Sequence, residues 1–391
     1  MPKLAYMKND PSVLLTVSQT EVDDDLIELL TSAVQKFPPS DAWKSVRVGV
    51  GGIYCGRTGV AYLFMNVDKT RPNLEIEGKR PIQWAAAYLS GDREPEPITT
   101  LSCGIFNEEL SFCAVAAAFY KDTAYVQKLL KYLDEIVSSN EGAFEYCYGR
   151  AGLLYLLRLV RSWFPESAEL VNPGMDSVIE NIMANGPPWI LDMGGTNDFG
   201  TVRYDFVGPG HGRMGIIVQI LLSNSTYASK LESALIELLD IQQEDGNWPD
   251  QWPGSQASEK NRHLVQWCHG APGMVQCLVA IREFFPHLQS RIDDSIAEGR
   301  RITWEKGLLI KEPNFCHGTT GNAFAFPPGE KRDHFLAHTT EQRVQEGYAA
   351  GAIENCDYGI TWSVAFGGIS RAVGWLWRDK ERGCYLGFDD V

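Results

Sequence analysis

A short glycine motif recurs along the whole chain, and this repeat constrains the fold more than any other feature of the sequence. Clear copies read CGRTGVAYL from Cys55, YGRAGLLYL from Tyr148, HGRMGIIVQ from His211, CHGAPGMVQ from Cys268 and CHGTTGNAF from Cys316, and weaker copies begin at Cys103 and Phe366. The first glycines of the copies are Gly56, Gly104, Gly149, Gly212, Gly270, Gly318 and Gly367. Their spacings are 48, 45, 63, 58, 48 and 49 residues. Seven similar units therefore fill the chain.

Each unit has room for about two helices. Segments 124–137 and 231–242 carry apolar residues at helical spacing, whereas 111–120 and 152–160 are apolar on nearly all sides. Signals for strands are few. An open array would need polar caps at its two ends, but here the first and last copies keep the inner apolar pattern. We therefore predict an all-α fold, a seven-repeat α/α toroid in the form of a double-layered helical barrel of about 14 helices.

The chain has 391 residues, of which 44% are hydrophobic, so it can bury a large core. We predict a single domain over residues 1–391, with residues 1–45 as an N-terminal lead-in. The net charge of -15 argues against nucleic acid as a partner, because an acidic surface repels phosphate. The most apolar window, residues 46–67, contains Arg57 and several glycines, which favours buried helices over a transmembrane segment.

Cysteine usage points to a reducing compartment. The nine cysteines are scattered and odd in number, unlike the disulfide framework of a small secreted protein. The N-terminal residues also lack the apolar region and small-residue cleavage site of a signal peptide. We expect a cytoplasmic protein. The arginines of the three G-R-x-G copies, Arg57, Arg150 and Arg213, are interpreted mainly as hydrogen-bond donors at helix ends.

Two consecutive copies place a Cys-His pair directly before the motif glycine. These pairs are Cys268–His269 and Cys316–His317, 48 residues apart. Equivalent positions on neighbouring units of a ring face the same centre, so the four soft ligands should converge, and thiolate with imidazole suits Zn²⁺. A structural zinc site would use all four ligands, whereas a catalytic site would use three and leave one position open. The alternative is two buried cysteines beside helix-capping histidines.

The segments around these residues resemble the eukaryotic lanthionine synthetase C-like proteins, relatives of the bacterial lanthipeptide cyclases. The similar segments are WCHGAPG from Trp267, GLLIK-x4-CHGTTGNAFAF from Gly307, YGRAGLLYL from Tyr148 and GNWPDQWPG from Gly246. With the repeat pattern, the resemblance covers about residues 51–376. It implies a double-layered α/α toroid with one Zn²⁺ per chain.

The resemblance also implies which residues form the metal site. Carried over position by position, the zinc ligands fall on Cys268, Cys316 and His317, with water or a substrate thiolate as the fourth ligand. The basic residue that contacts glutathione, five positions before the second cysteine, falls on Lys311. We therefore expect Lys311 to be a substrate-binding residue.

Three further residues are implied as catalytic. The histidine of the fourth repeat's H-G-x-x-G falls on His211, and the acid four residues before the third repeat's glycine falls on Glu145. His269 stands where the bacterial cyclases have tyrosine, as in the eukaryotic members. We expect His211 to supply a proton or to stabilise an enolate, and Glu145 to orient or charge it.

Several positions depart from the family pattern. Leu264 stands in place of a bacterial arginine, and Cys356 aligns with an arginine that helps relatives to hold glutathione. Phe366 replaces the glutamate of the final motif, and the second repeat reads GIFN at 104–107 where relatives have a GDAG-type sequence. These differences leave room for a more divergent thiol substrate.

The implied function is zinc-dependent activation of a thiol, either glutathione or a peptide cysteine. The sulfur would add to dehydroalanine or dehydrobutyrine in a peptide or protein and form a thioether. The alternative is a non-catalytic adaptor that binds zinc and glutathione. A toroidal hydrolase or terpenoid-type cyclase is a weaker alternative, because the sequence shows no convincing pair of catalytic carboxylates and no aspartate-rich motif.

Overall fold

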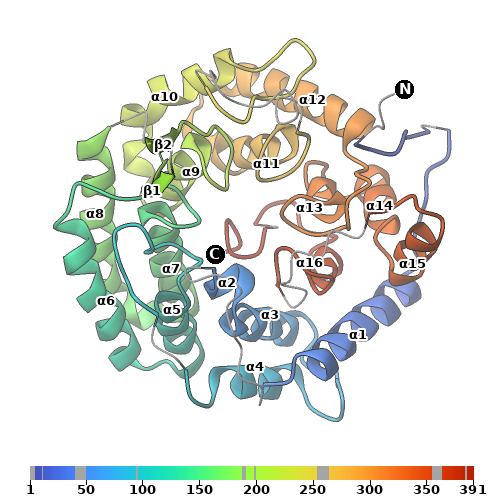
Figure 1. Ribbon diagram of the computed structural model, residues 1–391, viewed down its shortest axis with the longest axis horizontal. Coiled ribbons are helices and arrows are strands. Elements are labelled where there is room, and N and C mark those ends of the chain that lie inside the picture. The colour runs from blue at the N-terminus through green and yellow to red at the C-terminus, as the bar shows by residue number, and fades with distance from the viewer. Residues whose placement is uncertain are drawn as a thin grey trace.

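Two concentric layers of helices close into a ring around a central axis (Figure 1). This computed structural model describes residues 5–10, 12–39, 50–93, 96–186, 191–197, 200–252, 264–354, 363–383 and 385–391. The all-α toroid predicted from the repeats is confirmed. Among the described helices, none combines the length and the apolarity that a bilayer crossing requires.

The inner layer consists of one helix from each repeat, and each helix begins at or shortly after the motif glycine. These helices are α3 (Arg57–Thr70), α5 (Glu108–Tyr120), α7 (Arg150–Trp163), α9 (Arg213–Ser223), α11 (Ala271–Ile281), α13 (Thr319–Ala323) and α16 (Ser370–Leu376). They are buried on all sides; in α7 every residue from Arg150 to Val160 is buried. The inner helices therefore form the core, and the loops before them surround the axis.

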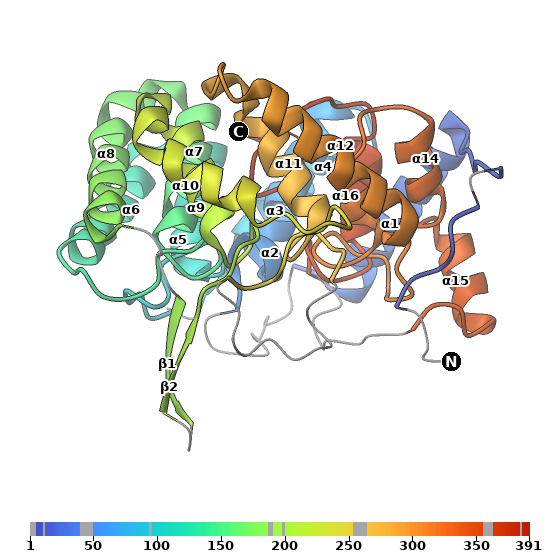
Figure 2. The same cartoon turned by 90° about the horizontal axis from the view of Figure 1, so that it is seen from above.

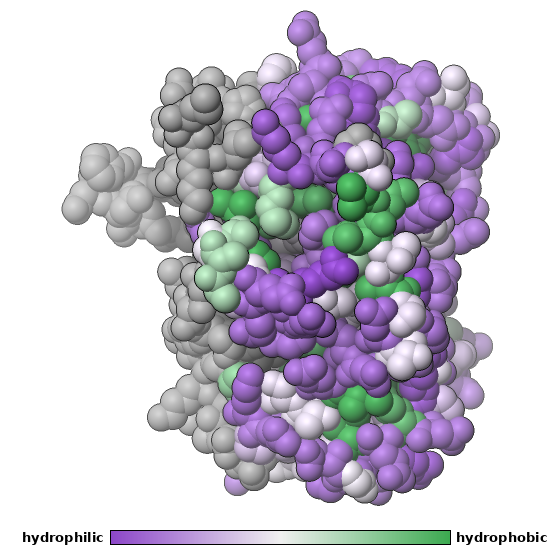
Figure 3. Space-filling view, turned by 90° about the vertical axis from the view of Figure 1, so that its right-hand side faces the viewer, coloured by the Kyte–Doolittle hydropathy of each residue, from purple (hydrophilic) through white to green (hydrophobic). Residues whose placement is uncertain are grey.

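The outer helices carry one apolar stripe and an exposed face. They are α1 (Gln19–Lys36), α4 (Pro81–Leu89), α6 (Thr123–Val137), α8 (Ala168–Asn185), α10 (Ala228–Asp240), α12 (Gln289–Lys306), α14 (Glu330–Ala337) and α15 (Glu341–Ala349). In α6 only Val126, Leu129, Leu133 and Ile136 are buried, which is the spacing of one helix face. Helix α1, inside the predicted lead-in, packs beside α16. The side of the ring seen in Figure 3 is mostly hydrophilic, with separate apolar patches.

The structure contains more elements than the roughly 14 helices predicted. Sixteen α-helices occur within the described ranges, because a short α2 (Gly52–Cys55) precedes α3 and two helices, α14 and α15, follow α13. Short 3-10 helices cover Pro165–Ser167, Ser225–Tyr227 and Arg282–Phe284. An antiparallel hairpin of β1 (Leu191–Asn197) and β2 (Gly200–Tyr204) was not anticipated. It lies in the longest spacing, between Gly149 and Gly212, and projects from one face of the ring (Figure 2).

Backbone hydrogen bonds link the motif loops of consecutive repeats. Each donor N–H bonds a carbonyl of a neighbouring motif loop: Ile53 to Ile105 (3.0 Å), Phe106 to Cys147 (3.1 Å), Cys268 to Cys316 (3.2 Å), Cys316 to Ala365 (3.0 Å) and Ala365 to Tyr54 (3.3 Å). The last bond joins the seventh repeat to the first and closes the ring. Glycine is required where loops meet, since a Cβ on Gly104 would lie 2.4 Å from the Cys147 carbonyl oxygen.

The motif arginine Arg150 donates hydrogen bonds at a helix end, as predicted. The fully buried Arg150 side chain donates to the backbone carbonyls of Ala143 (3.1 Å), Ile136 (3.0 Å) and Ser139 (2.8 Å), among others. Its five donors in a planar fork suit this task of tying a loop to the end of a neighbouring helix.

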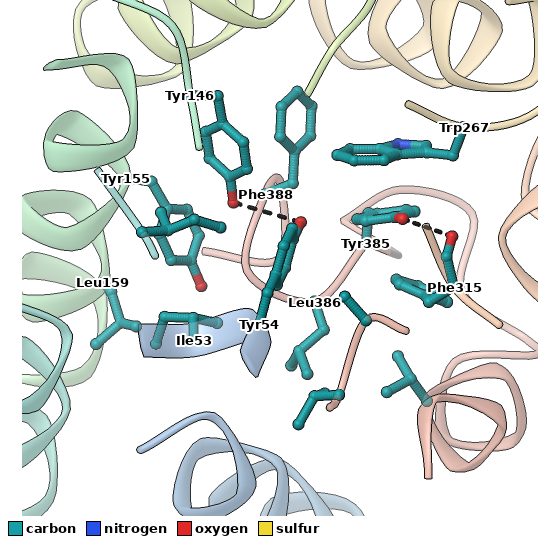
Figure 4. Packing of buried hydrophobic residues seen from close by; sticks show 14 of the residues in the cluster. Ile53, Tyr54, Tyr146, Tyr155, Leu159, Trp267, Phe315, Tyr385, Leu386 and Phe388 are labelled. Carbon is teal, nitrogen blue, oxygen red and sulfur yellow. Dashed lines mark hydrogen bonds between the residues drawn. The ribbon is translucent and has the colours of Figure 1, made fainter. Parts of the chain in front are cut away.

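Residues 385–391 fill the ring axis, an arrangement that the repeat pattern does not predict. Tyr385, Leu386 and Phe388 are buried among the inner helices and motif loops (Figure 4). The Asp390 carboxylate accepts hydrogen bonds from the hydroxyls of Tyr62 (2.6 Å) and Tyr155 (2.9 Å). The centre of the barrel is therefore packed protein, and the motif loops lie at one end of it.

Candidate metal centre

The two cysteine loops lie side by side at the ring axis. Cys268 precedes α11 and Cys316 precedes α13, and their backbones are joined by the Cys268 N–H bond to the Cys316 carbonyl. On the other side, Gly208 of the fourth repeat approaches so closely that a Cβ there would lie 2.3 Å from the Cys268 carbonyl oxygen. Close packing of neighbouring repeats therefore brings the two thiols together.

The ligand atoms of Cys268, Cys316 and His317 all lie within 4.8 Å of one another. Sulfurs in a tetrahedral zinc site are about 3.8 Å apart, given Zn–S bonds of about 2.3 Å, so small adjustments suffice for one ion. Both cysteines are 7% exposed. His269 is not part of this group, so the structure brings together the three-ligand set implied by the family resemblance. Two thiolates and one imidazole fit Zn²⁺ and leave a fourth position.

The surroundings of Cys268 favour the thiolate. A hydrogen bond from the Cys316 thiol lowers the pKa of Cys268 well below its ordinary value, with further contributions from His269 and His317 that together outweigh burial. The Gln266 side chain donates from Nε2 to Cys268 Sγ at 3.1 Å. These donors stabilise negative charge on sulfur, the form that binds metal.

Lys311 reaches the metal group through Gln266. Its Nζ donates to Gln266 Oε1 at 2.7 Å, so the ammonium, the amide and the Cys268 sulfur form a chain of hydrogen bonds. The structure places Lys311 beside the candidate site, and its role in binding substrate stays a prediction. Gln266 was missed by the sequence analysis; its only signal was its position two residues before Cys268.

His211 and Glu145 form a pair near the metal group. His211 Nδ1 lies 3.2 Å from Glu145 Oε2, and the side chains are 25% and 1% exposed. Burial opposes protonation of His211, but the hydrogen bond and charge of Glu145 outweigh it and raise the histidine pKa. The Glu145 carboxylate also accepts from the Cys147 backbone N–H at 2.7 Å and from Tyr148 N–H. The pair is therefore fixed in place and biased toward imidazolium.

His269 differs from His211 because, among the residues that the structure describes, no carboxylate bonds its buried Nδ1. Its ring stacks on that of His211, with centroids 6.1 Å apart and an angle of 23°. Burial lowers the pKa of His269. Its Nδ1 is buried and, within the described part of the chain, has no hydrogen-bond partner. His269 thus stacks on the histidine of the acid–base pair and directly follows Cys268 in the chain, in surroundings that disfavour its imidazolium form.

A second group of potential ligands was not predicted. One ligand atom each from Glu145, Cys147 and His211 lies within 4.8 Å of the others. Burial raises the pKa of Cys147 well above its ordinary value, with Glu145 adding to the effect. Because the carboxylate already bonds His211 and two backbone N–H groups, this group is better described as an acid–base pair beside an inert thiol.

Aromatic residues border the metal group. Phe366 stacks on His317, with centroids 5.4 Å apart and an angle of 25°, and contacts Phe106 at 6.3 Å. Two departures from the family pattern, GIFN and Phe366, therefore meet beside one predicted ligand. A phenyl ring there can hold the imidazole in place but cannot donate or accept a hydrogen bond as a carboxylate would. Cys356 lies outside the described residues.

Comparison with known proteins gives consistent matches. The model of the family "Lanthionine synthetase C-like protein" matches residues 49–328. Glutathione S-transferase LANCL1 of Danio rerio is 24% identical over 192 residues, 46% of this chain and 45% of that protein. LanC-like protein GCL1 of Arabidopsis thaliana is 25% identical over 199 residues, 47% and 42% of the two chains. The matches thus span under half the length of these relatives.

A solved structure has the same overall fold. Nisin cyclase superposes with a TM-score of 0.61 at 12% sequence identity, over 95% of this chain and 99% of that chain. At this identity the match concerns the fold. It agrees with the closed double layer of helices in Figure 1.

Proposed function

Because the chain belongs to the lanthionine synthetase C-like family, we propose that it activates a thiol at a zinc ion and adds the sulfur to dehydroalanine or dehydrobutyrine. The product is a thioether. The thiol is glutathione or a peptide cysteine, in keeping with the names of two similar proteins, a glutathione S-transferase and nisin cyclase. The observation that carries the proposal is the convergence of Cys268, Cys316 and His317 within 4.8 Å.

These three residues would hold one Zn²⁺ per chain. Zinc bound there supplies a Lewis acid that deprotonates a thiol and keeps its sulfur nucleophilic at neutral pH. The protein contributes a low-pKa Cys268, an amide donor in Gln266 and the Phe366 ring stacked on His317. The free cysteines of the described segments and this thiolate chemistry suit a reducing, cytoplasmic compartment.

His211 is proposed as the proton donor. Addition of sulfur to the β-carbon of a dehydroamino acid forms an enolate, with negative charge on the carbonyl oxygen. The α-carbon then takes a proton. His211 is partly exposed, and Glu145 raises its pKa, so it can supply this proton near neutral pH. His269, whose pKa burial lowers and whose ring stacks on His211, is proposed to polarise the carbonyl.

Lys311 is proposed to bind the thiol substrate. Its ammonium is fixed by Gln266 close to the Cys268 sulfur and offers a charge for a carboxylate of glutathione. We also propose that residues 1–391 act as one domain, because α1 packs on α16 and residues 385–391 pack at the axis.

The second candidate function is a non-catalytic adaptor that binds zinc and glutathione. Phe366 favours it, because a phenyl ring on His317 cannot take part in proton transfer where relatives have a glutamate. The two functions share the metal and the thiol. They differ in whether a dehydroamino acid is consumed.

The test is incubation of zinc-loaded protein with glutathione and a dehydroalanine peptide, followed by mass spectrometry. The enzyme proposal predicts a peptide heavier by one glutathione, formed faster than with protein stripped of metal. Zinc and glutathione binding without adduct would establish the adaptor. Stoichiometric zinc with adduct only at the uncatalysed rate would contradict the enzyme.

A further inference from the structure

Tyr385 lies between the two loops that carry the candidate metal ligands (Figure 4). Its ring stacks on Trp267, with centroids 3.9 Å apart and an angle of 12°. The ring centroids of Tyr385 and Phe315 are also 3.9 Å apart, and the angle between these two rings is 30°. The Tyr385 hydroxyl donates to the Phe315 backbone carbonyl at 2.6 Å. The residue is 1% exposed, so these contacts are made away from water.

Both contacted residues are direct chain neighbours of metal ligands. Trp267 precedes Cys268 and Phe315 precedes Cys316. The direction of each Sγ depends on the backbone of its loop, so a group that holds both preceding residues also limits how far the two sulfurs can separate. The loops themselves share the Cys268 N–H bond to the Cys316 carbonyl. Tyr385 adds a second connection on the side facing the ring axis.

The segment that carries Tyr385 is anchored on the opposite side of the ring. Asp390 accepts hydrogen bonds from Tyr62 of α3 and Tyr155 of α7. The Phe388 carbonyl accepts from Gln219 Nε2 of α9 at 3.0 Å. Residues 385–391 therefore connect the inner helices of the first, third and fourth repeats to the cysteine loops of the fifth and sixth.

We propose that Tyr385 is a positioning residue for the metal site. It holds the loops of Cys268 and Cys316 at the separation that one zinc ion requires, and thereby tightens zinc binding. The inference rests on the proposed function, since it concerns the same metal. Residues behind the ligands of a metal site commonly change metal affinity by 10–100-fold when they are substituted.

The hydroxyl separates this role from simple core packing. A phenylalanine at this position would fill nearly the same volume and keep both ring contacts. What it would lose is the bond to the Phe315 carbonyl, which acts on the Cys316 loop alone. Tyr88 of the outer helix α4 offers a matched control, because its side chain is also buried and its hydroxyl donates to a backbone carbonyl, that of Phe37, at 2.8 Å.

The experiment compares Tyr385→Phe with Tyr88→Phe in the full chain. Zinc affinity is measured by competition with a chelator, and ligand geometry by the visible absorption of the Co²⁺-substituted proteins. We expect Tyr385→Phe to weaken zinc binding about tenfold and to alter the cobalt spectrum. Tyr88→Phe should stay within about twofold of the unsubstituted protein, although both variants lose a hydrogen bond of similar strength from a tyrosine hydroxyl to a backbone carbonyl.

Equal zinc affinity and equal cobalt spectra in Tyr385→Phe and the unsubstituted protein would overturn the inference. Equal weakening in both variants would also overturn it, because it would indicate general destabilisation. If the unsubstituted protein binds neither metal, the proposed function fails before the role of Tyr385 arises. Tyr385→Leu, which removes both ring contacts, should weaken zinc binding further if it folds, as judged by circular dichroism.

Discussion

His211 and His317 occupy the same position in their repeats, directly before the motif glycine, yet their surroundings assign them different chemistry. His317 lies beside two buried cysteines and stacks on Phe366. His211 pairs with Glu145, and the residue before it is Gly210, which offers no ligand atom. The repeat thus fixes where a side chain points, whereas its neighbours decide whether an imidazole binds metal or carries a proton.

The largest expected effect is on the metal group around His317. Cys316→Ala should lose most of the zinc, because two remaining ligands cannot form a closed or nearly closed site. Adduct formation should be lost with it. Elemental analysis of the purified variant measures the first effect and mass spectrometry the second. Cys277→Ala, which removes a buried thiol within α11, is the matched control and should keep its zinc. Undiminished zinc in Cys316→Ala would contradict the ligand assignment.

Substitution of His211 should separate proton transfer from metal binding. His211→Ala should keep zinc and fold while adduct formation falls by ~10²–10⁴, the contribution of a general acid. His211→Asn should be equally slow, since an amide can cap a helix but cannot supply the proton. If asparagine instead restores activity and stability together, His211 is structural. Zinc content, melting temperature and adduct rate are measured for both variants.

The Glu145–His211 pair predicts a pH dependence. Because Glu145 raises the pKa of His211, the imidazolium persists above the ordinary histidine range, and activity should fall as pH rises through this raised value. Stability contributed by the pair should likewise be present below the ordinary histidine pKa and be lost as pH rises through the raised one. Glu145→Gln should shift the alkaline limb of the rate profile to lower pH. A limb that does not move would remove Glu145 from this role.

The smallest effect is expected at Lys311, which lies beside the metal group but is not one of the proposed zinc ligands. Lys311→Ala should weaken use of glutathione by about tenfold, corresponding to ~1.4 kcal/mol for one charged contact. Zinc content should be unchanged. Lys306→Ala is the control, because Lys306 lies close to Lys311 in the sequence but forms its ion pair with Asp245. Unaltered glutathione affinity in Lys311→Ala would show that the carboxylate binds elsewhere.

Much of the fold follows from the sequence because the repeat is a local pattern. The motif glycines mark the start of each inner helix, and the apolar character of 152–160 predicts the burial of α7. The approach of Cys268 to Cys316 was predictable for the same reason, since register in a ring places equivalent positions together. Register alone treats His269 and His317 alike, and the family resemblance implied which of the two joins the cysteines.

Other features depend on contacts between distant residues and left no local pattern. The packing of residues 385–391 at the axis uses Tyr62, Tyr155 and Trp267, which lie far away in the chain. The bond from Gln266 to Cys268 depends on the direction of one side chain. Neither arrangement has a periodicity that a sequence pattern could show. The hairpin was hidden in an unusually long spacing between motif glycines.

X-ray absorption at the zinc edge measures the ligand set of the proposed site. We expect two sulfur ligands, one imidazole nitrogen and one further light atom in the purified protein. Addition of glutathione should raise the sulfur count to three, because the substrate thiolate takes the open position. A site with four nitrogen or oxygen ligands would rule out Cys268 and Cys316 as zinc ligands, and a sulfur count that stays at two with saturating glutathione would rule out activation of this thiol at the metal.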